Sequence, residues 1–543
     1  MRSQRQKLSL RSFTWYGFNY SFNLLKIATL GYLFNQITDG GLHVGYHFFW
    51  ILLINGAFAI FIAQAFKKAV QTHTADQGGY FLFIRAWYGK FLSFYSLLFH
   101  YLFYPIVISY LIVGLTRVEF ADFVNGWGAY RTTFLDLIGL AIYWLIMVLM
   151  CFGLPWIKKA LNTITLFGLA ITIVLIIVLI QNAVHSHGHG WTLAVSRPLA
   201  FQSFIKCFTT VFGYFLGFSA FTTLTASVAN APRNIGRGTT LVLTGITVLS
   251  GLIALLLLGS FSGKFATNPL LGLQAGLWFK ILVTATLTTS VAVQIIMHNF
   301  CTSEGEMFPA AKYKFVPALY LRRNRYGALT RSILTNAIIG TISAVFLLLI
   351  PDVVVGAWRL QHNPFRLATL LQIIAILVMI IYLMILSIVV RLKIQLKYRH
   401  ISWWWVGLWL VSGGFLVLAI ACFFYELIAG LIAHTSKPVV MYNVCLLVYF
   451  GFDFTAPVIW YWCYYKPRVK QQPQIMHNVP AVKVIPFSDV ERFDQVLGLV
   501  QQQQPMTVVQ AKAHDLQVPL NSYHNDQALS PPPRDDKSAS QRV

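Results

Sequence analysis

Charged residues are scarce in this chain. Asp, Glu, Lys and Arg together make up 11% of its 543 residues, against about 25% in an ordinary soluble domain. Apolar residues make up 57%, and the mean hydropathy is +0.64. Apolar runs long enough to cross a bilayer, about 20 residues each, recur from end to end. The composition therefore excludes an ordinary soluble protein and indicates a polytopic, all-α membrane protein.

The sequence has few cysteines and lacks the common catalytic motifs. Most of the six cysteines fall within apolar runs and none forms a close pair, so neither a disulfide framework nor a zinc site is implied. The sequence contains no Ser-His-Asp arrangement, no His-Glu-X-X-His and no phosphate-binding loop. We therefore expect no cofactor and no metal, and a membrane enzyme is the less favoured class.

Acidic residues are outnumbered by basic ones, 17 to 41, which gives a net charge of +24. In a soluble protein this excess would suggest a nucleic-acid partner. Here Lys and Arg lie mostly in short connections between apolar runs, as the positive-inside rule describes. We expect no nucleic-acid partner, although a basic face can attract anionic membrane lipid.

Twelve membrane spans are predicted, and the positions of the basic residues support their number. Connections rich in Lys and Arg, such as those with Lys67 and Lys68 or Lys158 and Lys159, alternate with connections poor in them. This pattern predicts that both termini are cytoplasmic. The expected spans are 13–35, 44–66, 85–116, 134–154, 160–181, 201–226, 239–262, 276–300, 332–350, 364–391, 403–433 and 438–465.

The composition divides the chain into two parts. Residues 1–465 form the transmembrane domain, whose first apolar segment is read as a retained spanning helix because it is too long for a cleavable signal. Residues 466–543 are rich in Pro, Gln, Ser and charge, with low-complexity runs at 501–504 and 531–533. We expect this second part to be a flexible cytoplasmic tail.

Two of the spans are predicted to be interrupted. Residues 16–26 and 213–223 mix Gly or Asn with hydroxyl and aromatic side chains near the middle of a span. They lie five spans apart, so a repeat of five spans would place them in inverted orientation. Paired interruptions of this kind are typical of a midplane transport site, where freed N–H and C=O groups can bind a zwitterion. The alternative is that the small residues only allow close helix packing.

Three stretches carry a family resemblance, and together they span about the first 340 residues. They are residues 220–238 around Asn230, Pro232 and Arg233, residues 76–90 with Gly78-Gly79-X, and residues 303–330 with Asn324 to Gly327. In sequence and order they resemble the sixth-span end, the third-span entry and the loop after span eight of amino acid–polyamine–organocation (APC) permeases.

The resemblance implies a LeuT-like fold of two inverted five-span repeats, at 13–181 and 201–391, followed by two extra helices at 403–465. It also implies that a substrate carboxylate meets the first break and the amine meets the second. Carried over by position, the candidate substrate-binding residues are Ser21, Phe22, Asn23, Leu24, Leu25, Gly217, Phe218, Ser219 and Phe221.

The sequence departs from the family pattern at both breaks. Asn23 and Leu25 stand where the family usually has glycine, and Ser219, Ala226 and Ser227 replace acidic residues. The implied function is secondary active transport of amino acids across the cell membrane, by symport or exchange, with protons as a candidate coupling ion. A transporter-like amino-acid sensor without net transport is the main alternative; the particular amino acid and the oligomeric state stay open.

Lys26 is the candidate ion-coupling residue. It lies about half-way through the first span, where a charge costs about 2.5–3.5 kcal/mol on insertion scales. We therefore interpret it as a fixed or titrating cation beside the site, which would argue against a cationic substrate side chain. The alternative is a packing lysine whose stem reaches toward water.

Other polar residues in or near the spans receive structural interpretations. Glu426 and Asp453 are expected to have structural or oligomeric roles, and Glu304 and Glu306 to pair with nearby Lys or Arg. His100 and His298 are expected to be hydrogen-bonded packing residues. His185, His187 and His189 are read as a solvated loop rather than a metal site.

Overall fold

The computed structural model describes the larger part of the transmembrane region. The described residues are 9–22, 25–35, 42–72, 79–120, 128, 130–193, 198–223, 228–260, 277–357, 367–396, 401–433 and 437–471. Asn23, Leu24, Ala226, Ser227 and the expected tail from residue 472 onward lie outside them. Within the described residues every regular element is helical.

Ten described helical stretches are long and apolar enough to cross a membrane. Each corresponds to one of the expected spans, so the prediction of a polytopic helical protein is confirmed. They are built from α4 (His47–Thr72), α5 (Tyr80–Leu102) with α6 (Tyr104–Phe120), α7 (Arg131–Met150), α8 (Leu154–His185), α12 (Ala231–Gly259), α13 (Leu277–Phe300), α15 (Thr330–Ala344), α17 (Leu367–Leu396), α18 (Trp403–Ile432) and α19 (Lys437–Trp460).

Some of these spans extend through shorter helical elements. The π-helix η4 (Cys301–Met307) and α14 (Phe308–Lys312) continue α13, and η6 (Val345–Leu349) with α16 (Ile350–Ala357) continues α15. The last span runs on through η7 (Tyr461–Tyr465) and α20 (Lys466–Gln471), so helical structure passes the expected boundary at 465. Outside the two interrupted segments, the other short helices among the described residues are α9 (His189–Leu193) and η5 (Ala318–Leu321).

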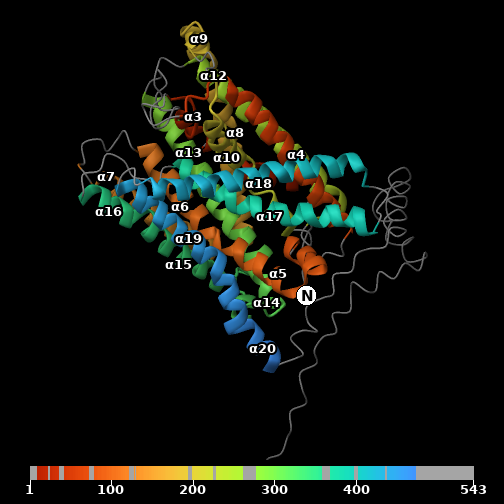
Figure 1. The fold of residues 1–543 in the computed structure, drawn as a ribbon. Coiled ribbons are helices and arrows are strands. Elements are labelled where there is room, and N and C mark those ends of the chain that lie inside the picture. The colour runs from red at the N-terminus through yellow and green to blue at the C-terminus, as the bar shows by residue number, and fades with distance from the viewer. Residues whose placement is uncertain are drawn as a thin grey trace, which may run out of the picture. The chain divides into compact units, whose positions relative to one another are not determined.

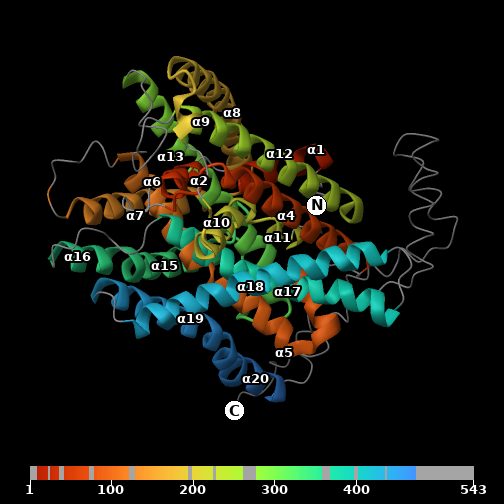
Figure 2. The same cartoon turned by 45° about the horizontal axis from the view of Figure 1, so that its top comes forward.

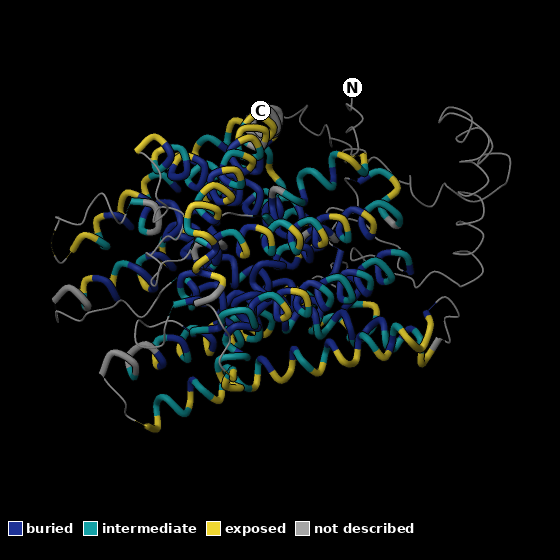
Figure 3. The backbone as a smooth tube through the Cα atoms, turned by 90° about the horizontal axis from the view of Figure 1, so that it is seen from above, coloured by how far each residue is buried: buried dark blue, intermediate teal, exposed yellow. Residues whose placement is uncertain are grey.

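The packing separates a buried centre from apolar outer faces. Buried residues gather in the middle of the helices and exposed ones follow the outer helices (Figure 3). In α18, which lies beside α17 and α19 (Figure 1), large apolar side chains such as Trp404 (74% exposed) and Val417 face outward. Exposed apolar surface on this scale is what a lipid-facing helix presents and a soluble protein avoids.

The first interrupted segment, residues 10–34, consists of three short helices. α1 (Leu10–Ser21) begins at Ser9, whose side chain accepts a hydrogen bond from the Ser12 backbone N–H. It ends at Ser21 because Phe22 is extended (φ −87°, ψ 123°), and the chain resumes as α2 (Leu25–Ala28) and α3 (Leu30–Phe34). α1 packs against α12 and α13 (Figure 2).

The second interrupted segment, residues 201–223, breaks in a similar way. α10 (Phe201–Phe212) tightens into the 3₁₀-helix η2 (Gly213–Phe215), Leu216 is extended, and α11 (Ser219–Thr223) follows. Gly217 has φ +103°, a conformation that side-chain-bearing residues rarely adopt. A Cβ there would also lie 2.6 Å from Tyr20 Cε1, so this glycine lets the two breaks approach each other.

Replacing Gly217 with Ala should therefore destabilise the protein. The strained backbone costs about 1–3 kcal/mol, and the added methyl must displace the Tyr20 ring. We expect Gly217→Ala to lower the thermal unfolding midpoint of the detergent-purified protein. Gly414→Ala in α18, where a Cβ meets nothing within 4 Å, is the matched control and should change it little. Equal midpoints for the two variants would contradict this account.

Candidate functional site

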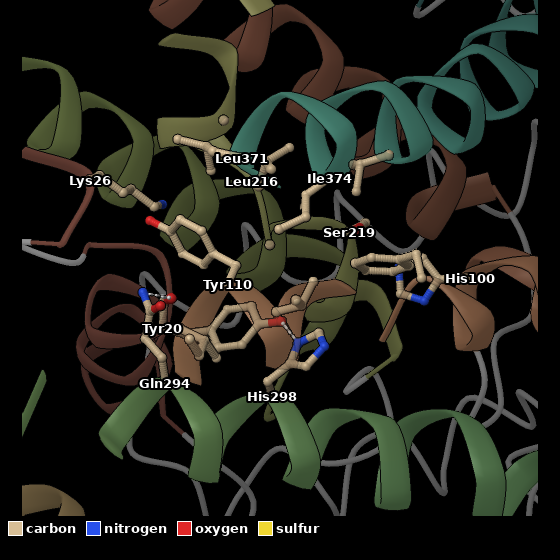
Figure 4. Close-up of a pocket in the computed structure, with 16 residues that line it drawn as sticks. Tyr20, Lys26, His100, Tyr110, Leu216, Ser219, Gln294, His298, Leu371 and Ile374 are labelled. Carbon is tan, nitrogen blue, oxygen red and sulfur yellow. Dashed lines mark hydrogen bonds between the residues drawn. The ribbon is translucent and has the colours of Figure 1, made fainter. Parts of the chain in front are cut away.

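A cavity lies between the two interrupted segments and three continuous spans. Its walls come from α1, α2, α5, α6, η2, α13, α17 and the turn before α11 (Figure 4). About 600 Å³ between these walls is free of protein atoms, open solvent included. The lining residues are Tyr20, Lys26, His100, Phe103, Val107, Tyr110, Leu111, Gly213, Leu216, Gly217, Ser219, Gln294, His298, Leu371, Ile374 and Val378.

Lys26 connects the two breaks. Its Nζ donates to the carbonyl of Ser21, the last residue of α1, at 2.6 Å, and to the carbonyl of Tyr214 in η2 at 2.8 Å. Both carbonyls lie at C-terminal ends of interrupted helices, where backbone acceptors are unsatisfied and the helix dipole is negative. The lysine is 8% exposed, so these two contacts replace most of its hydration.

The hydroxyl of Thr29 strengthens the same junction. It donates to the Lys26 carbonyl at 2.6 Å and lies 2.6 Å from the Tyr214 hydroxyl. Side chain and backbone of Lys26 are thus both held against the second interrupted segment. The Lys26 ammonium group is therefore held by the protein at this junction.

Tyr20, Gln294 and His298 form a polar connection on the α13 side of the cavity. Gln294 Nε2 donates to the Tyr20 carbonyl at 3.1 Å, and the Tyr20 hydroxyl lies 2.9 Å from His298 Nδ1. The His298 ring stacks on Tyr104, with centroids 5.0 Å apart. These contacts fix the end of α1 against α13, as expected for a hydrogen-bonded packing histidine.

His100 pairs with Glu306. His100 Nδ1 lies 2.6 Å from Glu306 Oε1, and both side chains are at most 5% exposed. The expectation that Glu306 pairs with a Lys or Arg is therefore wrong, because the π-helix turns this carboxylate into the protein interior toward α5. The expectation is confirmed for Glu304, which receives two hydrogen bonds from Arg323, at 2.5 and 2.7 Å.

The structure places the predicted site residues in three groups. Lys26, Gly217 and Ser219 line the cavity, and Ser21 contributes its carbonyl to Lys26. Four others pack elsewhere. Asn23 and Leu24 lie outside the described residues.

Those four residues have clear packing partners. Phe22 stacks on Phe18, with centroids 5.2 Å apart, and Leu25 fills the space left by the absent side chain of Gly114. Phe218 stacks on Tyr382, with centroids 4.6 Å apart, and Phe221 meets Phe13 edge-on at 5.3 Å. These positions hold the breaks in place from outside the cavity.

Several lining residues were not among the predicted ones. Gln294 and His298 are four residues apart on α13 and so share one helix face. These two residues and His100 in the third span could have been predicted to line the cavity, because polar side chains inside a span tend to face a cavity or a partner. Tyr20 and Tyr110 carried no such signal, since aromatic residues are frequent throughout the spans.

The comparison with protein families agrees with this geometry. Residues 14–452 match the model of a family described as amino acid permease. The chain belongs to the amino acid permease family. That family consists of transporters rather than enzymes, so the chain is a multi-pass membrane protein that transports amino acids across a membrane. No curated protein matches it.

The permease has a second, smaller cavity between α1, α8 and α13. It contains about 450 Å³ free of protein atoms, open solvent included, and Phe22 faces it together with Phe18. The hydroxyl-bearing residues in its wall are Thr172, Thr286, Thr289 and Ser290. The predicted residue Phe22 therefore faces this cavity and not the one that contains Lys26.

A buried charge network joins three spans of the permease away from the cavity. Arg117 in α6 contacts Asp136 of α7 and Asp352 of α16, with Arg117 Nε 2.6 Å from Asp136 Oδ1. The two carboxylates are at most 1% exposed. By contrast, Lys206 of α10 and Glu426 of α18 form a partly exposed pair at 3.2 Å.

These two sets of charges should differ in their effect on stability. Arg117→Gln leaves two buried carboxylates without their cation, a change that costs about 3–5 kcal/mol. Lys206→Gln breaks a partly exposed pair, which is worth about 0–1 kcal/mol. We expect Arg117→Gln to lower the thermal unfolding midpoint of the purified permease strongly and Lys206→Gln to lower it little. Similar losses in both variants would count against the network's role.

Proposed function

We propose that this permease is a secondary active carrier that binds its amino acid in the cavity between the two interrupted segments. The two segments and the ten continuous spans together give twelve spans in a LeuT-like arrangement of two inverted repeats plus two extra helices. Both termini are cytoplasmic and the protein lies in the cell membrane. Transport proceeds by symport or exchange.

The observation that carries this proposal is the position of Lys26. Its ammonium group has three donors, and two of them bind the carbonyls of Ser21 and Tyr214. Among the described residues no further partner binds the ammonium group, and at the cavity wall a substrate carboxylate can accept the third donor. A cationic substrate side chain is disfavoured there by like-charge repulsion.

The two carbonyl contacts favour a fixed cation over a titrating one. Each carbonyl lies at a helix C-terminus, and both stabilise the charged form of the lysine. In carriers with interrupted helices, freed carbonyls of this kind coordinate the coupling cation. We propose that the charged form of Lys26 supplies that positive charge and that the exchangeable coupling ion binds elsewhere.

Uptake by the purified permease in liposomes tests the proposed function. A mixture of labelled amino acids is offered with and without an inward proton gradient, and separately to liposomes loaded with amino acids. We expect accumulation of at least one amino acid in one of these conditions. Substrate binding without any uptake, by protein shown to be folded, would indicate a sensor and contradict the proposal.

Lys26→Met should abolish transport. The variant keeps the length of the side chain but removes the charge, so the carbonyls of Ser21 and Tyr214 lose their common donor. We expect uptake to fall to the level of empty liposomes. Lys280→Met is the matched control, because this lysine of α13 is not part of the cavity wall; it should retain uptake. Unchanged uptake kinetics in Lys26→Met would show that the lysine only packs.

A further inference from the structure

The pair formed by His100 and Glu306 lies at the edge of the cavity, across from Lys26. His100 lines the cavity, and the close-up shows it and Lys26 on opposite sides (Figure 4). Glu306 is 2% exposed. Among the described residues, His100 Nδ1, His100 Nε2 and Glu306 Oε2 have no hydrogen-bond partner, although Nδ1 lies 2.6 Å from Glu306 Oε1. Both residues of the pair therefore have a position at which a proton can bind.

The described side chains found to interact with this pair carry no permanent charge. In the described part of the chain, the basic side chain that pairs with Glu306 is His100. The other titratable groups that face Glu306 are Tyr20 of α1, Tyr80 and Tyr101 of α5, and Cys301 of η4. His298 of α13 faces His100. Tyrosine and cysteine are ordinarily neutral near pH 7, so the charge of the pair depends on its own protons.

The pair is electrically neutral with one proton and negative without it. With one proton, imidazolium faces carboxylate, or neutral imidazole faces the carboxylic acid. Loss of that proton leaves an uncompensated carboxylate in the protein interior, which is strongly unfavourable. The pair can thus remain buried when it holds the proton and requires access to water when it has lost it.

The π-helix that carries Glu306 also touches the second break. A Cβ added at Gly305 would overlap the Thr223 hydroxyl at the end of α11, so η4 and α11 are in direct contact at this glycine. π-Helical turns of this kind occur frequently at functional sites. A change in the charge of Glu306 is therefore adjacent to the end of the second interrupted segment.

We propose that His100 and Glu306 form the proton-binding site of the permease, and that one proton bound there crosses with each substrate. The inference rests on the proposed carrier function and names its coupling ion. The proton enters from water on the side to which the cavity is open, binds at imidazole or carboxylate, and leaves from the same pair on the other side. Without the proton, the negative pair holds the cavity open to water.

Transport by isosteric variants separates this coupling from substrate exchange. Glu306→Gln removes the acid and keeps the shape of the side chain. We expect this variant to lose all stimulation of uptake by an inward proton gradient, while amino-acid exchange into loaded liposomes stays measurable. Glu304→Gln, on the same π-helix but paired with Arg323, is the control and should keep the stimulation.

Infrared difference spectra of the purified permease after a pH jump give a readout that needs no substrate. We expect a protonated-carboxyl band that disappears in Glu306→Gln and persists in Glu304→Gln. Wild-type protein in which no carboxyl band depends on Glu306 would overturn the proton site, whether or not the protein transports amino acids.

The transport outcomes distinguish the two proposals. Gradient-stimulated uptake that persists in Glu306→Gln would overturn the inference. Wild-type exchange without any stimulation by the gradient would also overturn it but leave the carrier function intact. Absence of both uptake and exchange in the wild type would refute the carrier function itself, and with it the co-transport of a proton; the infrared band would then support only the binding of a proton at the pair.

Discussion

The contact between one ammonium group and two backbone carbonyls is the constraint on which the centre of this permease depends. Lys26 Nζ binds the ends of two helices, the second of which lies 188 residues further along the chain. An interrupted helix in a membrane is tolerated only where its freed backbone groups find partners. One ammonium group supplies such a partner for both breaks. The two carbonyls in turn reduce the free-energy cost of burying a charge in the middle of a span.

The cavity follows from the same constraint. Because the helices stop at Ser21 and Phe215, the second break presents Gly213, Leu216, Gly217 and Ser219 to the cavity. Gly217 allows the close approach of Tyr20, and the rings of Phe218 and Phe221 pack away from the cavity. These two rings thus hold the second break in place.

The sequence predicted the spans and the interruptions but not how side chains far apart meet. Apolar length determines a span, and Gly, Asn and hydroxyl residues weaken a helix locally, so both could be derived from neighbouring residues. Which way Phe22 or Leu25 points depends on Phe18 and Gly114, and no local pattern encodes that. The pairing of Glu306 with His100 depends on a π-helix that rotates the carboxylate inward, and its sequence resembles an ordinary helix end.

The two charged groups at the cavity differ in kind, and this difference suits a coupled carrier. In the proposed carrier, Lys26 is held by two backbone carbonyls and attracts the substrate carboxylate at one end of the cavity. The proposed proton site at His100 and Glu306 lies at the other end. In this proposal, Lys26 attracts the substrate, and the separate pair of His100 and Glu306 binds the proton. Proton binding can then change the charge of the cavity without breaking the contacts of Lys26 that join the two interrupted helices.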